Sequence, residues 1–285
     1  MIGRIGRFLA GLRRRYRLGR GLERVADAAR AGPAPRESEH LVSLLERLGL
    51  RAGHIVDIGA SDAVGLSPTL PLLRDPAWRG LAVECKPARF GRLAFALRDF
   101  PQIALARVRV TPANVVALLH GHGVPERFAV LKLDIDSYDL FVLEALLASP
   151  YRPGVIVLEV NENIPPPLYF SVLFSEDHAW TGDHFQGCSI VAACAVARPA
   201  GYRLEHLDYN NAHFVREDLA GSLVRDLSPA EAYRAGYVDR QDRRARFPWN
   251  ADMDDLREMA PERAVEALRA RFRRYEGKFV LELRG

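Results

Sequence analysis

The sequence predicts an α/β fold: a mostly parallel sheet of seven strands that closes with an antiparallel β-hairpin. The first observation is a regular alternation of helical patterns with short apolar runs, which are candidate strands at 54–58, 81–85, 103–108, 128–133 and 155–160. This alternation predicts right-handed crossovers and a parallel sheet with helices on both faces. The second observation is a further pair of candidate strands, 202–207 and 212–216, whose short connection predicts the closing hairpin.

Helical periodicity separates the candidate strands. In the first expected helix, 39–48, Leu41, Leu44 and Leu48 share one face, and Gly49 follows as a stop signal. The same periodicity predicts helices at 87–98, 112–120, 138–148 and 188–197.

Three parts are expected along the chain. Residues 1–36 form a basic segment and linker, 37–220 form the α/β domain, and 221–285 form a mainly helical extension that ends in a short strand. Within the domain, the proline- and aromatic-rich loop 161–187 follows the fifth strand. A loop this long inside a compact domain is usually functional, so we expect it to wall a binding pocket.

The composition is that of a globular protein with a sizeable core, because 48% of the 285 residues are hydrophobic and the net charge is +4. The small excess of base is almost entirely arginine and gives no ground for a nucleic-acid partner. The three cysteines lack metal-ligand spacing, so a reducing cytoplasm is the expected location. No uninterrupted apolar run reaches the roughly 20 residues of a membrane span, and arginines interrupt the N-terminal apolar residues, so no signal peptide is expected.

Residues 1–20 have the pattern of a basic amphipathic helix. Apolar residues recur at helical spacing, and arginines fill many positions between them. Such a helix can lie on an anionic membrane surface, which would make the cytoplasmic protein peripheral at the inner membrane. Alternatively, the helix packs on its own chain or on a second subunit of a homo-oligomer. Both interpretations stay open.

A Gly-bearing turn and a later acid form the first chemical motif. Gly59 follows the first strand, where the lack of a Cβ would let a nucleoside-bearing cofactor lie against the main chain. Glu84 ends the second strand, near the roughly 20-residue spacing at which an acid binds ribose hydroxyls. Ser61 and Val64 occupy the places of the second and third glycines of a dinucleotide fingerprint. Asp57 and a single glycine therefore favour S-adenosylmethionine, which has no pyrophosphate, although an ordinary β-turn also fits.

Carboxylates at the ends of the fourth and fifth strands form the second motif. Asp134 and Asp136 stand at the carboxyl end of the fourth strand, and Glu159 and Asn161 stand at the end of the fifth. Residues two apart on a strand share a face, so these four side chains are expected in one crevice. An all-oxygen set suits Mg²⁺ or Mn²⁺ and argues against zinc. The alternative is a hydrogen-bonded network that only orders loops. Asp139 is expected to complement the dipole of the following helix, with Ser137 as its cap.

The order of four segments, 110–114, 133–139, 156–161 and 210–215, resembles the FkbM-like class I S-adenosylmethionine-dependent methyltransferases. The resemblance covers about 42–216, and the segment 247–250 is also similar. It implies a Rossmann-like sheet, S-adenosylmethionine as cofactor, and O-methylation of a sugar or other hydroxylated metabolite in a cell-surface glycan or natural product. More distantly, the acidic stretch resembles metal-dependent sugar O-methyltransferases. The chain departs from their pattern because Glu159 and Asn161 are not an adjacent acidic pair, which leaves the metal open.

The resemblance also implies roles for residues around the cofactor. The methionine moiety would approach Gly59 and Ser61, Asp57 would engage its ammonium directly or through water, and Glu84 would bind the ribose. Asn114 is the polar candidate beside the adenine, although its Thr-Pro context is also a good helix start.

Methyl transfer to a hydroxyl needs a base or a metal, together with in-line positioning of the reactants. Asp134 is the first candidate for base or ligand and is also assigned to the cofactor set. His213 is the second candidate, against a plain histidine on the solvent face of a hairpin. In the loop 161–187, the candidates for binding the small-molecule or glycan acceptor are Tyr169, His178, Trp180 and His184, unless the aromatic rings only pin the loop.

Two other functions remain. A nicotinamide-dependent oxidoreductase shares the first turn and Glu84, but the missing glycines and the closing hairpin count against it. A non-catalytic scaffold would keep the fold and use its helical extensions for contacts.

Overall fold

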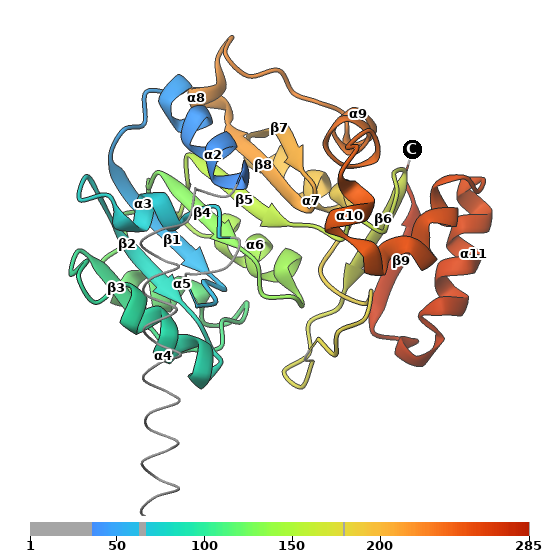
Figure 1. The fold of residues 1–285 in the computed structure, drawn as a ribbon, viewed down its shortest axis with the longest axis horizontal. Helices are drawn as coiled ribbons and strands as arrows, with labels where there is room; N and C mark the ends of the chain where they lie inside the picture. Colours follow the sequence, from blue (N-terminus) through green and yellow to red (C-terminus); the bar gives the residue numbers. More distant parts are fainter. Residues whose placement is uncertain (1–35, 63–66, 179, 285) are drawn as a thin grey trace, which may run out of the picture.

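The computed structural model describes residues 36–62, 67–178 and 180–284, and its centre is one twisted seven-stranded sheet (Figure 1). The strand order is β3-β2-β1-β4-β5-β8-β7. The parallel strands are β1 (Gly53–Ile58), β2 (Trp78–Val83), β3 (Ile103–Ala106), β4 (Val130–Leu133) and β5 (Val155–Glu159). The last two, β7 (Tyr202–Asp208) and β8 (Asn211–Arg216), form a hairpin, and β8 pairs antiparallel to β5. The predicted fold class is confirmed.

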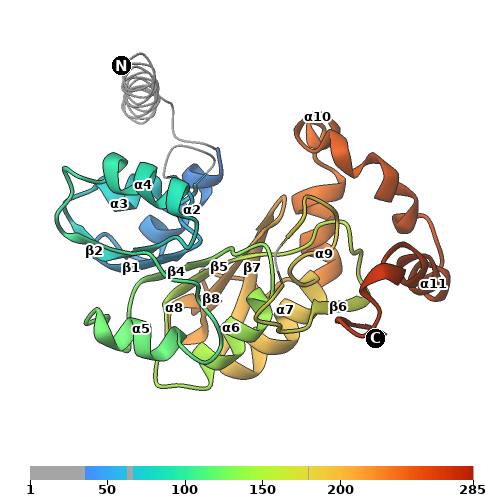
Figure 2. The same ribbon diagram turned by 90° about the horizontal axis from the view of Figure 1, so that it is seen from below.

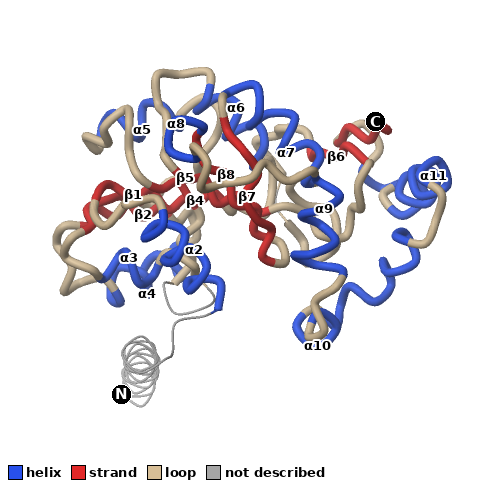
Figure 3. Tube along the Cα trace, turned by 90° about the horizontal axis from the view of Figure 1, so that it is seen from above, coloured by secondary structure: helices blue, strands red, loops and turns tan. Residues whose placement is uncertain are grey.

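Helices cover both faces of the sheet, as Figures 2 and 3 show from opposite sides. One face carries α2 (Arg36–Arg47), α3 (Leu70–Arg74) and α4 (Pro87–Ala96); the other carries α5 (Val115–Gly121), α6 (Asp139–Leu147) and α7 (Ile190–Ala197). Alternate residues of the strands feed two separate apolar clusters. On β1, Ile55 joins the cluster beneath α2, and Val56 joins the cluster beneath α5 and α6. The predicted strands are apolar at successive positions because both of their faces are buried.

Several boundaries differ from the expectations. The strand β3 ends at Ala106 and not at residue 108, and β4 begins at Val130 and not at residue 128. The helix α5 begins at Val115, because the backbone of 111–114 forms a turn closed by the Asn114 side chain. The short helix α3 was not predicted; its five residues are too few for a periodic pattern.

The long loop 161–187 contains a strand that the sequence pattern did not indicate. This strand, β6 (Leu168–Val172), pairs antiparallel with β9 (Phe279–Leu283) near the end of the chain. The predicted final strand is therefore present, and its partner lies in the loop. With α11 (Pro261–Arg271), the two strands enclose a third apolar cluster that includes Phe170, Phe185 and Leu268. Figure 1 shows this unit beside the hairpin end of the main sheet.

A buried polar network holds the chain just after β5. Asn250, in the 3₁₀ segment η3 (Pro248–Arg257), donates to Glu162 Oε1 at 2.6 Å and to the Tyr237 hydroxyl at 3.1 Å. Its Oδ1 accepts from Asn163 Nδ2 at 3.2 Å. The segment 247–250 thus ties the C-terminal extension to the start of the long loop.

The predicted basic helix at 1–20 lies outside the described residues. Within the described ranges, the helices are all too short or too polar to cross a membrane.

A histidine cluster lies between α2 and the hairpin. His213 is fully buried, and its ring meets His40 edge-on at 4.9 Å between centroids, while His40 stacks on His206 at 4.1 Å. His40 contacts Glu205 at 2.9 Å, and Arg47 donates to the same carboxylate at 2.7 Å. Burial, followed by the nearby His40, lowers the pKa of His213 and brings the pKa of His206 to about 4. The expectation of a solvent-facing His213 is wrong, because α2 covers that face of the hairpin.

We predict that the free energy of unfolding falls as the pH drops from 7.5 to 5.5. In the unfolded chain, histidines gain protons below about pH 6.5, whereas His206 and His213 stay neutral in the native state. The free energy of unfolding therefore falls by on the order of 1 kcal/mol for each of these two histidines. Glu205 also faces the cluster. Burial would raise its pKa, but hydrogen bonds from His40 and Arg47 lower the pKa to about 2, so the contribution of Glu205 to stability is lost only below this pH window. Urea unfolding of the wild type and of His213→Leu at both pH values measures the effect. An equally steep pH dependence in the variant would contradict this assignment.

Candidate active site

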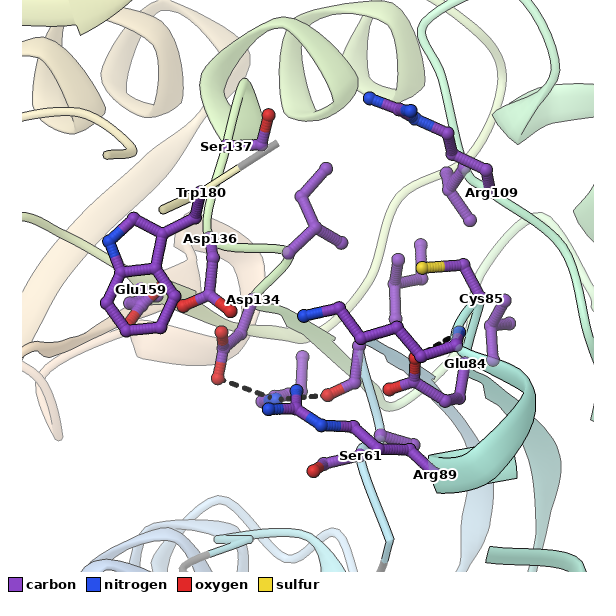
Figure 4. Close-up of a pocket in the computed structure, with 18 of the residues that line it drawn as sticks. Ser61, Glu84, Cys85, Arg89, Arg109, Asp134, Asp136, Ser137, Glu159 and Trp180 are labelled. Carbon is purple, nitrogen blue, oxygen red and sulfur yellow. Dashed lines mark hydrogen bonds and ion pairs between the residues drawn. The ribbon is translucent and has the colours of Figure 1, made fainter. Parts of the chain in front are cut away.

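A cavity of about 660 Å³ opens at the carboxyl ends of β1, β2 and β4 (Figure 4). Open parallel sheets bind their ligands at this edge. The cavity brings together eight of the predicted site residues: Gly59, Ser61, Glu84, Asp134, Asp136, Glu159, His178 and Trp180. It does not include Asp57, Asn114, Asn161, Tyr169, His184 or His213 in its lining.

The turn after β1 is shaped by β4. Gly59 has a φ of +85°, and a Cβ at this position would lie 1.6 Å from the carbonyl oxygen of Asp134. The missing side chain therefore makes room for the neighbouring backbone, and not for a ligand as the sequence suggested. The amides of Gly59 and Ala60 both donate to the Val83 carbonyl at 2.9 Å, which holds the turn against β2. Ser61 follows with a left-handed φ of 54° and lines the cavity.

Glu84 is a buried acid that faces the cavity from the end of β2. Its Oε1 accepts the backbone N–H of Lys86 at 2.6 Å, which fixes the carboxylate in place. The side chain is thus oriented for ligand hydroxyls at the position where the sequence predicted a ribose-binding acid.

Lys132 on β4 is the residue that the sequence interpretation missed. Its ammonium lies 2.9 Å from Asp134 Oδ2 and 3.7 Å from Asp57 Oδ1, and it donates to the Gly59 carbonyl at 3.1 Å. Burial by itself would lower the pKa of Lys132, but the adjacent Asp134 and Asp57 raise it above its usual value, so the ammonium stays charged. A single lysine inside an otherwise apolar strand, 130–133, was the available signal.

Asp57 is fully buried beneath this lysine. The Thr69 hydroxyl donates to its Oδ2 at 2.5 Å, and Lys132 stands beside its other oxygen. Burial raises the pKa of Asp57, and Lys132 and Thr69 oppose that rise. The expected direct contact between Asp57 and a cofactor ammonium is therefore wrong, because Lys132 is its cationic partner.

Three carboxylates meet on the opposite wall. Ligand oxygens of Asp134, Asp136 and Glu159 all lie within 4.8 Å of one another. Glu159 is 8% exposed, and its Oε1 accepts from Asn210 Nδ2 at 3.1 Å. Its buried Oε2 has no hydrogen-bond partner among the described residues. Burial, then the charge of Asp134, raises the pKa of both Glu159 and Asp136. Like charges this close favour a retained proton or a bound cation.

Asp139 orders the turn that carries these acids. Its two oxygens accept the backbone N–H groups of Ile135 at 2.7 Å and Ser137 at 2.9 Å. Burial raises its pKa to about 7 despite those bonds. The expected cap by Ser137 is absent: the N-cap of α6 is Tyr138, and the Ser137 hydroxyl has no hydrogen-bond partner within the ranges that the structure describes.

Asn161 lies away from the carboxylate cluster. Its Nδ2 donates to the carbonyls of His184 at 2.8 Å and Gln186 at 3.1 Å, across the two ends of the long loop. The prediction that it shares a face with Glu159 fails because β5 ends at Glu159, so side chains no longer alternate beyond it.

Four other predicted site residues make their contacts outside the cavity. Asn114 closes the turn before α5 by accepting from the Thr111 amide at 2.8 Å. His213 lies in the cluster under α2. Arg284 covers the Tyr169 ring at 3.8 Å from its centroid, and His184 contacts Asp252 at 2.9 Å.

The long loop does supply one wall of the cavity. His178 and Trp180 line it, and the Trp180 indole donates to the Asp183 carbonyl at 2.6 Å. Arg109, which follows β3, ties this wall down by donating to the His178 carbonyl and to the Tyr138 hydroxyl. The expectation that the loop walls a pocket agrees with this arrangement.

No protein-family model matches the chain, and no curated protein matches it. Among solved structures, the chain is similar to the N-terminal domain of EvdMO1 crystallised with S-adenosylhomocysteine and D-fucose, with 16% identity, 63% of this chain and 80% of that chain covered, and a TM-score of 0.40. A TehB-like methyltransferase from Corynebacterium glutamicum has 14% identity, coverage of 73% and 97%, and a TM-score of 0.37. The N-methyltransferase NodS from Bradyrhizobium japonicum has 13% identity, coverage of 64% and 97%, and a TM-score of 0.36. These likenesses are remote, and the chemistry of the cavity rests on this chain's own residues.

We predict that Lys132→Met lowers the free energy of unfolding by about 3–5 kcal/mol, because it leaves the buried Asp57 without its counter-charge. Adding Asp57→Asn should restore part of that loss, since the amide needs no cation. Urea unfolding of the single and double variants measures both effects, with Lys278→Met, an exposed lysine, as control. A single variant as stable as the wild type would contradict the role of Lys132.

Proposed function

We propose that the chain is an S-adenosylmethionine-dependent methyltransferase of the FkbM-like type. The observation that carries the proposal is Glu84, a buried carboxylate held at the end of β2 and facing the cavity beside the Gly59 turn. The closing hairpin, with β8 antiparallel to β5, supports it, because a dinucleotide-binding sheet is parallel at that edge.

The cavity offers a place for each part of this cofactor. Glu84 would accept hydrogen bonds from both ribose hydroxyls. Val108 and Val110, which follow β3, offer an apolar wall for the adenine. The turn at Gly59 and Ser61 would border the methionine moiety. Ligand-sized cavities of 300–1,000 Å³ are typical, and about 660 Å³ leaves room for part of an acceptor.

The bound cofactor supplies an electrophilic methyl group, and the residues of the chain have to position and deprotonate the acceptor. A hydroxylated metabolite, such as a sugar of a glycan or natural product, fits a wall made of one aromatic ring and several carboxylates. Asp134 is the proposed base, because Lys132 orients its carboxylate through Oδ2 and the side chain lines the cavity beside Asp136 and Glu159. The Trp180 ring offers a face for a sugar ring, and His178 lines the same wall.

A divalent cation belongs to the proposal as an alternative to a retained proton. The donor set fits Mg²⁺ or Mn²⁺, because three carboxylates converge and the buried Glu159 Oε2 has no partner in the described part of the chain. Asp134, Asp136 and Glu159 would hold the ion, and it would lower the pKa of an acceptor hydroxyl. Asn161 is not part of this set.

The other proposals concern location and partners. We retain residues 1–20 as a proposed contact for an anionic membrane surface or a second subunit. A nicotinamide-dependent oxidoreductase is less well supported, because Ser61 and not glycine follows the first turn. A non-catalytic scaffold has no need for a buried Glu159 and a partly buried Asp136 that converge in the cavity with raised pKa values.

We predict that the purified chain binds S-adenosylhomocysteine with micromolar affinity in calorimetry and does not bind NADH. Glu84→Gln should weaken the binding by about tenfold or more, because a neutral amide with one acceptor oxygen replaces a charged carboxylate with two. Glu262→Gln, at a position in α11 remote from the cavity, is the matched control. Binding of NADH without S-adenosylhomocysteine would overturn the proposed function.

We predict that Asp134→Asn keeps the affinity for S-adenosylhomocysteine but lowers methyl transfer by about 100-fold or more, the usual size of a lost general base. Release of S-adenosylhomocysteine from S-adenosylmethionine, with a panel of monosaccharides and nucleotide sugars as acceptors, measures the rate. Running the assay in EDTA and in MnCl₂ tests the cation, since a rate insensitive to EDTA contradicts the metal alternative. Full activity in the variant would exclude Asp134 as base.

A further inference from the structure

We propose that Arg89 binds the carboxylate of the cofactor's amino-acid end and thereby selects cofactors that carry one. This inference rests on the proposed function and adds a binding residue to it. Arg89 lies in the first turns of α4 and lines the cavity together with Gly59 and Ser61. Figure 4 shows its guanidinium extending into the cavity above Ser61, on the side of Asp134.

The guanidinium of Arg89 has no protein partner of its own. Within the part of the chain that the structure describes, it forms no hydrogen bond and no ion pair, although the side chain is only half-exposed. Its neighbour Arg92, one turn further along α4, pairs with Asp62 at 3.1 Å. A guanidinium has five N–H donors in a planar fork that matches a carboxylate, so a partly buried one with no partner is suited to an anionic ligand.

The other cations of the cavity are committed or lie elsewhere. Lys132 already serves Asp57 and Asp134. Arg109 follows β3, on the adenine side of the proposed cofactor site, and is bound to Tyr138 and to the His178 carbonyl. Lys86 also lines the cavity, and its charge also reaches Asp136, but its side chain is exposed and its backbone N–H holds Glu84 at the ribose end.

The acids of the cavity make this cation necessary. A carboxylate bound near the Gly59 turn would face Asp134 and Asp136, whose charges repel it. Burial and the charge of Asp134 raise the pKa of Asp136, and the charges of Lys86 and then Arg89 oppose that rise, so Arg89 is close enough to act on this acid. Arg89 would therefore offset the repulsion at the end of the ligand where an α-carboxylate has to lie.

The test compares two ligands that differ only in this end. S-adenosylhomocysteine carries the amino-acid group, whereas 5′-methylthioadenosine keeps the adenosine and the sulfur but lacks it. Calorimetry with the full chain should show that Arg89→Gln lowers the affinity for S-adenosylhomocysteine by about tenfold or more, as expected for the loss of a charged hydrogen bond. The affinity for 5′-methylthioadenosine should change by less than about twofold, a difference below 0.5 kcal/mol. Arg92→Gln is the matched control on the same helix and should leave both affinities unchanged.

Three results would overturn the inference. In the first, Arg89→Gln leaves both affinities unchanged. In the second, it lowers the affinity for both ligands equally, which would assign Arg89 to the adenosine part or to the shape of the cavity. Thermal melting of the variant separates the second result from unfolding. A wild-type chain that binds neither ligand would reject the proposed function, and with it this inference, before any variant is compared.

Discussion

The cavity depends on one buried ammonium. Lys132 holds together the end of β1, the turn after it and the end of β4, because it contacts Asp57, the Gly59 carbonyl and Asp134 at once. Its ammonium lies between the buried Asp57 and the partly exposed Asp134 and offsets the repulsion between the two carboxylates. The same packing leaves no room for a side chain at residue 59, whose Cβ would overlap the Asp134 backbone. The contacts of Lys132 therefore fix both the turn after β1 and the orientation of the Asp134 side chain.

The remaining carboxylates are handled in different ways. Asp139 is satisfied by two backbone amides and serves the turn, so it is removed from the chemistry. Glu159 accepts one hydrogen bond, from Asn210, and its Oε2 has no partner among the described residues. Burial and the charge of Asp134 raise the pKa values of Asp136 and Glu159. The unmet requirement for a proton or a cation thus remains on one wall of the cavity, next to Asp134. The reactivity of Asp134 would follow from the uncompensated negative charge on this wall of the cavity.

The opposite wall depends on residues far away in the chain. The long loop that carries His178 and Trp180 is held at its start by Asn250 and along β6 by β9. The C-terminal extension therefore supports the cavity, although its described residues, 221–284, do not line it. A change in the extension would act on ligand binding through the position of this loop.

The sequence by itself determined the strands of the main sheet and, except for α3, the helices between them. It also determined the closing hairpin and the presence of Glu84, Asp134, Asp136 and Glu159 at the ligand-binding edge. These features follow from local periodicity and from the rule that parallel strands end together. Only the tertiary structure decided the pairing of Lys132 with Asp57, the turn of Asn161 into the loop, the burial of His213 beneath α2, and the β6–β9 pair. Each of these depends on a partner distant in the sequence or on the residue at which a strand ends, and periodicity carries no information about either.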